Sequence, residues 1–329
     1  MSSSLSYDGA LALDHWSVIR ARGEDAGKFL HQQLSQDVLG QPVSEARLAA
    51  YCTAKGRMLA SFVLVHAGDD EWLLVCAADI AAAVKKRLQM YVLRAKVVLE
   101  HAEDLHPSGV AGAPARDLWG PDAAPWSVRV QDAGVLVRLP EVTPPGHATV
   151  ARVLALGVPP TACAALARDA WDTLEVLSGI PHIEAVNVEQ FVPQMVNFDV
   201  VGGVNFKKGC YPGQEVVARS HYLGALKRRM FLFEASEVVA AGDDVFHAGD
   251  PEQPCGRVVN AACAGAGRWL ALVEMKLSAA DAAASTPRSP GTPGRVLLHA
   301  RAIDGAGLSP LPLPYEVAAQ DSRERQLTP

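Results

Sequence analysis

The sequence predicts an α+β protein that ends in a small β-barrel. Up to about residue 225, candidate helices alternate with candidate strands joined by short loops, the pattern of an α+β layer with antiparallel strands. After Arg229 the pattern changes to short strands separated by glycine-rich turns, which is typical of a small barrel. We therefore expect an α+β body over 1–225, a barrel over 226–317 and a polar tail over 318–329. The body can divide into two subdomains, with a middle part at about 101–170.

The first hundred residues contain the clearest elements. Runs of alternating or β-branched residues predict strands at 14–20, 58–65, 72–76 and 96–99. Between them we expect one helix from Asp25 to about Leu34 and a second that starts at Asp79, with the two aspartates as N-caps. The second helix carries an apolar residue at every fourth position, which predicts one buried face: Ile80, Val84, Leu88 and Val92.

Residues 101–160 give weaker patterns, with strands at 128–130 and 135–137. Thr161 is a candidate N-cap for a helix that would turn four residues inward: Cys163, Leu166, Ala170 and Leu174. In the C-terminal part we expect five strands, at 230–233, 244–246, 255–259, 269–273 and 296–302. The stretch 278–294 is rich in Ala, Ser, Pro and Gly and indicates a loop insertion.

Composition excludes several classes of protein. No apolar run approaches the 18 residues or so that a membrane span needs, and the first ten residues lack the features of a secretory signal. We therefore expect a cytoplasmic protein. A net charge of −6 disfavours general binding to nucleic acid, so direct nucleic-acid contact is not expected. No nucleotide-binding glycine string follows a predicted strand.

The six cysteines stand at 52, 76, 163, 210, 255 and 263, and none forms a Cys-x-x-Cys pair. A self-contained zinc or iron–sulfur site normally needs closely spaced ligands, so we expect no tightly bound metal. Scattered cysteines without a signal peptide are typical of reduced thiols.

The string Lys207-Lys208-Gly209-Cys210-Tyr211-Pro212-Gly213-Gln214-Glu215 is the most informative stretch. Tyr-Pro-Gly-Gln has the form of a type II turn, because proline fixes φ at its second position and glycine supplies a positive φ at its third. A short helix over 214–222 would follow, with Val216, Val217 and Tyr222 as inward candidates. Cys210 would then lie on an exposed bend near helix amides and Lys208. Both favour a thiolate, so we expect Cys210 to be the functional thiol.

The same string resembles the signature of the YgfZ family, folate-binding proteins implicated in iron–sulfur protein maturation and similar in fold to the glycine-cleavage T-protein. The resemblance extends through several flanking segments: Gly179-Ile180-Pro181, Gln190 to Gln194, Asn197, Gly202 to Phe206, Ala218-Arg219 and Gly224 to Arg228. Weaker matches cover much of 14–100 and Leu313-Pro314-Tyr315. The resemblance implies a T-protein-like folate-binding body and a tetrahydrofolate derivative as ligand.

On this resemblance Trp16 and Trp171 match tryptophans associated with the folate site. A folate needs apolar plates for its pterin, hydrogen-bonding groups at the pterin edge and a cation for its carboxylate tail. The further candidate contacts from the motif region are Gln194, Asn197, Gln214, Glu215 and Arg219. Glu215 and Arg219 would alternatively form an exposed i,i+4 ion pair.

Two departures from related sequences bear on chemistry. Aminomethyltransferases carry paired aspartates where this chain has Ala60 and Ser61, neither of which can transfer a proton as a carboxylate does. This departure is shared with YgfZ proteins and argues against aminomethyl transfer. Relatives also carry Glu-Ala-Gly where this chain has Leu177-Ser178-Gly179, so the glutamate expected at the pterin edge is missing.

The resemblance thus implies a folate-binding protein that assembles or repairs iron–sulfur proteins and supports tRNA thiolation indirectly. Cys210 would serve as a transient cluster ligand, a sulfur carrier or a redox thiol, and the sequence does not choose among these. A folate-dependent one-carbon transferase or demethylase is the first alternative. The second is a tRNA-contacting module built from a basic cluster: Lys207, Lys208, Arg219, Lys227, Arg228 and Arg229. The folate form, the client proteins, catalytic turnover and the oligomeric state stay open.

Overall fold

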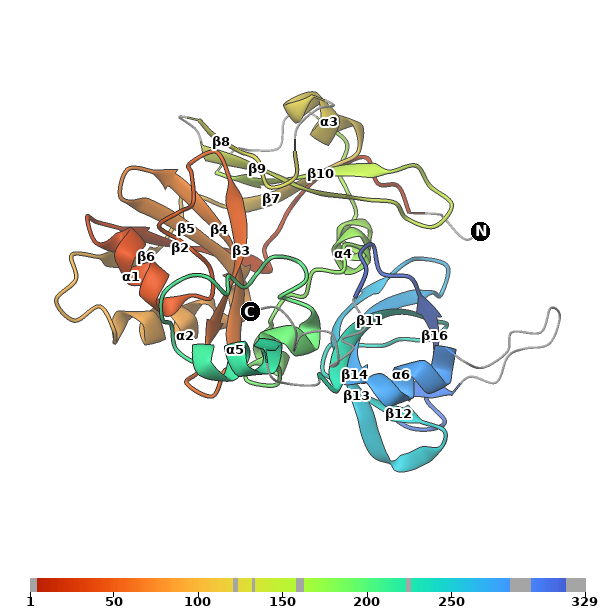
Figure 1. Cartoon of the computed structure of the whole chain (residues 1–329). Coiled ribbons are helices and arrows are strands. Elements are labelled where there is room, and N and C mark those ends of the chain that lie inside the picture. The colour runs from red at the N-terminus through yellow and green to blue at the C-terminus, as the bar shows by residue number, and fades with distance from the viewer. Residues whose placement is uncertain are drawn as a thin grey trace, which may run out of the picture.

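Two antiparallel sheets and a closed β-barrel form this protein, as Figure 1 shows for the computed structural model. The structure describes residues 5–120, 124–131, 134–157, 163–222, 226–284 and 297–317. Helices and sheets are mixed up to residue 222 and the barrel follows, so the predicted α+β class with a C-terminal barrel is confirmed. The predicted tail, 318–329, lies outside the described residues.

The first sheet has the strand order β3-β4-β5-β2-β6. Its strands are β2 (Trp16–Arg22), β3 (Ala46–Cys52), β4 (Met58–Gly68), β5 (Glu71–Ala77) and β6 (Val98–His101). Two helices, α1 (Ala26–Gln33) and α2 (Ala78–Gln89), bury their apolar residues against one face of it. In α2 the predicted inward positions Ile80, Val84 and Leu88 are buried, as the i+4 spacing requires. The predicted fourth position was wrong, because α2 ends at Gln89 and the partly buried Val92 follows it.

The second sheet has the order β1-β7-β10-β9-β8. Its strands are β1 (Gly9–Ala12), β7 (Pro107–Ala111), β8 (Val128–Gln131), β9 (Gly134–Val142) and β10 (Val150–Leu156), and α3 (Ala113–Trp119) packs on it. Strand β1 pairs with β7 about a hundred residues later in the chain, with Gly9 opposite Ala111. Strand β1 therefore belongs to the second sheet, which the sequence did not predict.

Helix α4 (Arg168–Leu177) connects the sheets to the barrel and packs on strands β13 and β14. The predicted start of this helix was wrong. It begins at Arg168, so Cys163 and Leu166 precede it, while Thr161 lies outside the described residues. Ala170 and Leu174 are buried as expected. The chain then passes through two 3-10 turns, η1 (Ala185–Asn187) and η2 (Pro193–Val196), to α5 (Gln214–Tyr222).

The barrel closes in the order β11-β14-β13-β12-β15-β16. Its strands are β11 (Arg228–Ala235), β12 (Asp244–His247), β13 (Asp250–Cys263), β14 (Trp269–Lys276), β15 (Leu298–Ala300) and β16 (Ala306–Leu311). The loop predicted at 278–294 is wrong in its first part, because α6 (Leu277–Ala284) covers those residues. The alanine-rich segment has high helix propensity; 285–296 lie outside the described residues.

The helix caps differ from the prediction. Asp25 stands at the N-cap of α1, but its Oδ2 accepts the backbone N–H of Lys96 at 2.9 Å instead of a helix amide. Asp79 lies inside the first turn of α2, behind the N-cap Ala77, and its carboxylate accepts the N–H of Ala185. Both aspartates therefore hold distant segments of chain, a use that local sequence rules do not reveal.

Candidate functional site

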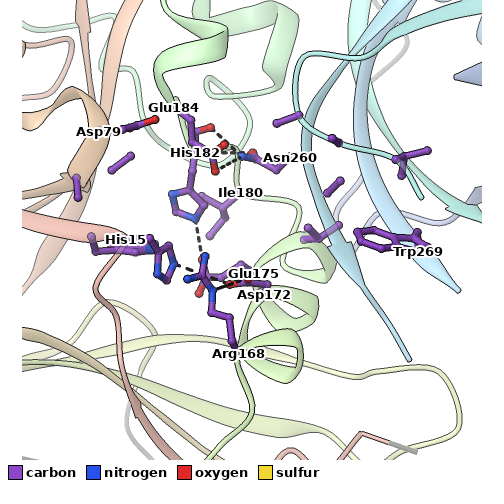
Figure 2. Close-up of a pocket in the computed structure, with 18 residues that line it drawn as sticks. His15, Asp79, Arg168, Asp172, Glu175, Ile180, His182, Glu184, Asn260 and Trp269 are labelled. Atoms are coloured by element: carbon purple, nitrogen blue, oxygen red, sulfur yellow. Dashed lines mark hydrogen bonds and ion pairs between the residues drawn. The ribbon is translucent and has the colours of Figure 1, made fainter. Parts of the chain in front are cut away.

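A cavity of about 530 Å³ lies where α4 faces the first sheet and the barrel (Figure 2). Its volume is within the range of roughly 300–1,000 Å³ typical of small-molecule sites. Polar and aromatic side chains from all three parts of the fold line it, among them His15, Trp16, Asp79, Arg168, Asp172, Glu175, His182, Glu184, Asn260 and Trp269. The cavity is thus a junction that no single segment of sequence could form.

Helix α4 supplies the charged wall. Arg168, Asp172 and Glu175 stand at i, i+4 and i+7, so they share one face of the helix, which turns toward the cavity. The Arg168 guanidinium donates to both oxygens of Asp172, at 2.8 and 2.6 Å. The opposite face is apolar and is buried in the shared core. This amphipathic pattern fixes which side chains reach the cavity.

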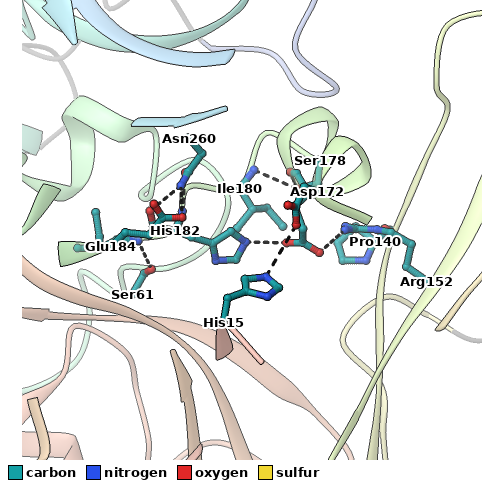
Figure 3. Close-up of polar contacts among 12 residues, drawn as sticks. His15, Ser61, Pro140, Arg152, Asp172, Ser178, Ile180, His182, Glu184 and Asn260 are labelled. Atoms are coloured by element: carbon teal, nitrogen blue, oxygen red, sulfur yellow. Dashed lines mark hydrogen bonds and ion pairs between the residues drawn. The ribbon is translucent and has the colours of Figure 1, made fainter. Parts of the chain in front are cut away.

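A polar network beside α4 includes Arg152 and His182 (Figure 3), and Glu175 is the residue that joins these two. Its Oε1 accepts a hydrogen bond from Arg152 Nη1 at 2.7 Å, and its Oε2 lies 2.7 Å from His182 Nε2. Burial alone would raise the pKa of Glu175, but Arg152 and His182 together hold it below its ordinary value. Glu175 is therefore an ionised carboxylate at neutral pH. It stands two residues before the position where the sequence lacks the expected glutamate.

Other groups in the cavity have shifted pKa values. Burial raises the pKa of Asp172, with Arg168 opposing the shift, and burial also raises the pKa of Glu184. Burial, with the nearby charge of Arg168, lowers the pKa of His15 to about 4. At pH 7 His15 is thus a neutral imidazole, and its Nε2 lies 3.8 Å from Asp172 Oδ1. Shifted titratable groups gathered in one cavity are characteristic of binding and catalytic sites.

The two tryptophans predicted to contact folate lie in different environments. Trp16 lines the cavity, with its ring 4.7 Å from the His182 ring in an edge-on arrangement. Trp171 is fully buried and does not line it. A Cβ on Gly109 would lie 2.6 Å from the Trp171 ring, so this indole packs directly on the backbone of β7. The structure places Trp171 in the core, where no ligand could stack on it.

Gln194 and Asn197 are also completely buried, away from the cavity. The Gln194 side chain donates to the carbonyl of Val217 in α5 at 2.6 Å. Asn197 adopts a left-handed φ of 56°, and its side chain donates to the carbonyl of Met230 in β11 at 2.8 Å. These amides therefore join the motif helix and the barrel to the connecting segment.

The cysteine motif forms a separate surface feature. Cys210 is exposed, as predicted. Lys208 is directed into the end of α1, where its ammonium donates to the carbonyls of His31 and, at 2.8 Å, Leu34. Burial lowers the pKa of Lys208 to about 8, with the charges of Asp37 and Cys210 opposing the shift. Lys208 thus stabilises the C-terminal end of α1 and holds the cysteine loop against it.

The rest of the motif follows the predicted local structure in part. Helix α5 spans 214–222 as expected, and Val217 is buried, but Val216 and Tyr222 are largely exposed, so their predicted inward orientation was wrong. Gln214 donates weakly to the carbonyl of Lys208, at 3.4 Å. Glu215 and Arg219 are exposed on α5, and no ion pair between the described residues joins them. None of these three residues lines the cavity.

Gly213 is needed for the turn that carries Cys210. The turn is closed by the Gln214 N–H donating to the Tyr211 carbonyl at 3.1 Å, and Gly213 has φ 81°, as a type II turn requires. A Cβ at Gly213 would lie 2.4 Å from the Thr53 carbonyl oxygen.

Replacing Gly213 with alanine should therefore destabilise the protein. The left-handed φ alone costs about 1–2 kcal/mol for an L-residue, and the contact with Thr53 adds to it. Gly202→Ala is the matched control, because Gly202 has φ 83° and nothing within 4 Å of its Cβ position. Urea unfolding should show a clearly larger loss for Gly213→Ala; equal losses would mean that the packing on Thr53 contributes nothing.

The cavity residues other than Trp16 were not predicted from the sequence. One signal was present, the charged i, i+4, i+7 series of α4, but the misplaced helix start hid it. No sequence pattern marks the remaining cavity residues His15, His182 and Glu184. His15 stands next to Trp16, and the other two follow Gly179-Ile180-Pro181. Among the described residues no helix has the length and apolar character needed to cross a membrane, and no group of three or more ligand side chains could hold a metal ion.

The fold defines the class of protein. It aligns with the glycine cleavage system aminomethyltransferase T of Bartonella henselae with a TM-score of 0.63, over 84% of this chain and 80% of that chain, at 15% sequence identity. The protein therefore has the T-protein fold.

The particular family follows from sequence. No family model matches the chain, but it is 32% identical to the tRNA-modifying protein YgfZ of Photorhabdus laumondii, over 79% of this chain and 82% of that protein. It is 30% identical to YgfZ of Sodalis glossinidius over 93% of both chains. YgfZ of Klebsiella pneumoniae is 32% identical over 80% of this chain and 84% of its own. The chain belongs to the YgfZ family.

Proposed function

We propose that this protein binds a reduced folate in the cavity beside α4 and takes part in tRNA modification. The observation that carries the proposal is the cavity itself, which combines an indole wall, several carboxylates and one arginine within about 530 Å³. The YgfZ relatives are named tRNA-modifying proteins, and the fold is that of an aminomethyltransferase.

The residues present fit the chemistry of a folate. The pterin edge offers N–H donors, and the cavity wall offers the carboxylates of Asp172 and Glu184 as acceptors. Trp16 would cover one face of the ring system, and Arg168 would meet the carboxylate tail, exchanging part of its contact with Asp172. When bound, a reduced folate can supply a carrier for one-carbon units. Glu175 would act indirectly, by holding His182 beside Trp16.

We further propose that Cys210 acts in the assembly or repair of iron–sulfur proteins, through which tRNA thiolation is supported indirectly. Its exposure, the nearby N-terminus of α5 and its place in the motif support this role. The role of Cys210 as transient cluster ligand, sulfur carrier or redox thiol stays open. Client or assembly proteins of iron–sulfur chemistry would then be the partners, in the cytoplasm.

The folate site is tested by tryptophan fluorescence. Tetrahydrofolate should quench the emission of the wild-type protein, and Trp16→Leu should weaken binding by about 1–3 kcal/mol, or roughly 5- to 150-fold in Kd, because a stacked ring is lost. Trp119→Leu is the control, since Trp119 is buried at the C-terminal end of α3, away from the cavity. Calorimetry without heat at millimolar tetrahydrofolate would reject the site.

A folate-dependent one-carbon transferase or demethylase is the alternative function. The Ser61 hydroxyl has a structural role, because it accepts a hydrogen bond from the backbone N–H of Ile183 at 2.9 Å. Ala60 has no polar side-chain group. We expect no formation of methylene-tetrahydrofolate from an aminomethyl-loaded carrier protein above the uncatalysed rate, since no carboxylate stands at these positions. A catalysed rate in this assay would favour the transferase.

The structure does not favour the tRNA-contacting cluster. Arg228 pairs with Glu274 at 2.9 Å, and Arg229 is buried against Asp199 at 2.6 Å. Lys208 is engaged by the end of α1. Three of the six cations are therefore engaged by carboxylates or carbonyls of the protein, which leaves little free positive charge for a phosphate-binding surface.

A further inference from the structure

Exposed apolar side chains directly follow α2, away from the cavity. Met90, Tyr91 and Leu93 are exposed to 59%, 46% and 87%. They lie within four residues directly after α2, at the start of the connection to β6, and we call this region the 90–98 surface. Single exposed apolar residues are ordinary, but several clustered in one short segment mark a site of association.

The backbone presents this surface rigidly. A turn over 92–95 is closed by the Ala95 N–H donating to the Val92 carbonyl at 2.8 Å, and Leu93 within it has φ 44°. A left-handed φ is rare for a bulky residue and persists only where the surroundings enforce it. Asp25 supplies the anchor through its bonds to both backbone groups of Lys96. The chain thus maintains a strained conformation that points a leucine into solvent.

Three cations lie close in the sequence to the 90–98 surface. Lys86 lies four residues before Met90 on the exposed side of α2, and Lys85 and Arg94 flank the connection. No ion pair between the described residues involves these three cations, whereas Lys96 is paired with Glu24. Three cations without a carboxylate partner among the described residues give this part of the molecule a local positive charge, which favours an anionic partner.

We propose that the 90–98 surface docks a partner protein that offers an apolar pocket with an acidic rim. Leu93 enters the pocket as the central anchor, and Lys85, Lys86 and Arg94 face the acidic rim. Methionine, tyrosine and arginine are enriched at protein interfaces, which usually have an apolar centre and a polar border.

The composition of the surface selects a protein over a nucleic acid. Single-stranded nucleic acid is held by aromatic side chains that alternate with cations, and Tyr91 is the one aromatic residue here. An exposed aliphatic group such as Leu93 gains nothing from contact with phosphates. The proposal goes beyond the proposed function and does not depend on folate binding.

Arg87, at the end of α2, hydrogen-bonds to Tyr51 of β3, and Tyr51 is bridged to Leu34, whose carbonyl binds Lys208. The end of α2 and the cysteine motif are therefore linked through Tyr51 and the end of α1.

Photo-crosslinking in the host tests the proposal. A benzoylphenylalanine at position 93 of the full-length protein should form one discrete protein adduct, identified by mass spectrometry. With that protein purified, the affinity should fall at least tenfold for the charge reversals Lys86→Glu and Arg94→Glu together, and it should fall with added salt. The control site is Val238, which is 52% exposed on the barrel; the same probe there should not give this adduct.

Leu93→Asn separates docking from folding. Asparagine tolerates a left-handed φ better than leucine, so this variant should unfold at the same temperature as the wild type or higher, yet bind the partner at least tenfold more weakly. Adducts with only tRNA, lipid or a second copy of this chain would overturn the proposal. So would the absence of a discrete adduct, or an affinity that neither substitution changes.

Discussion

A Cys210→Ser variant is expected to fold like the wild type and to fail in restoring iron–sulfur enzyme activity to a deletion strain. The side chain is exposed, so the nearly isosteric change leaves packing intact. Function should be lost because a thiolate attacks sulfur or binds iron at neutral pH, whereas a serine hydroxyl does neither well. The measurements are thermal unfolding of the purified variant and the activities of several iron–sulfur enzymes in complemented cells.

Cys163→Ser is the matched control, because Cys163 is also partly accessible but lies outside the motif. It should complement fully. Buried cysteines are poorer controls: burial raises the pKa of Cys52 and of Cys76 to about 12, and a serine in their place would bury an unpaired hydroxyl. Full complementation by Cys210→Ser would make the motif a structural turn and remove Cys210 from the proposed function.

An Arg152→Met variant is expected to lose about 3–5 kcal/mol of stability, the usual effect of removing one partner of a buried ion pair. Arg152 is almost completely buried, and Glu175 would remain in the interior with only His182 beside it. Arg168→Met, which breaks the half-exposed pair with Asp172, is the control and should lose at most about 1 kcal/mol. Urea unfolding at pH 7 measures both.

The pH dependence provides a second check of the same pair. The pKa of Glu175 is lowered in the folded protein, so its stabilising contribution is present above the unfolded value and is lost as the pH falls through the folded value. Without Arg152, burial dominates and raises the pKa of Glu175. The deficit of Arg152→Met should therefore be largest near pH 7 and shrink on acidification. If the loss of unfolding free energy in Arg152→Met does not depend on pH, the loss comes from packing alone.

A double-mutant cycle completes the test. Arg152→Met combined with Glu175→Leu should recover much of the stability lost by Arg152→Met alone, because no uncompensated charge remains in the interior. Tetrahydrofolate binding by the double variant then reports whether Glu175 is needed to hold His182 beside Trp16. Strictly additive losses would show that Arg152 and Glu175 do not act as a pair.

The sequence predicted correctly several features that depend only on residues close together in the chain. The type II turn with a positive φ at Gly213, the exposed Cys210 and the helix over 214–222 all follow from residues adjacent in the chain. The helix α2 and the strand pair β4–β5 were predicted because their apolar residues keep a strict period. The same rules misplaced the start of α4 and missed α6, where short segments offered competing patterns.

The sequence by itself determined the family, the α+β body with its barrel, and the motif that presents Cys210. Only the tertiary structure decided which polar residues meet. It brought Glu175, Arg152 and His182 into contact, buried Trp171 against Gly109 and left Trp16 at the cavity. The physical reason is that backbone conformation depends on neighbours along the chain, whereas burial and ion pairing depend on the packing of α4 between two sheets and a barrel. No local pattern encodes that packing.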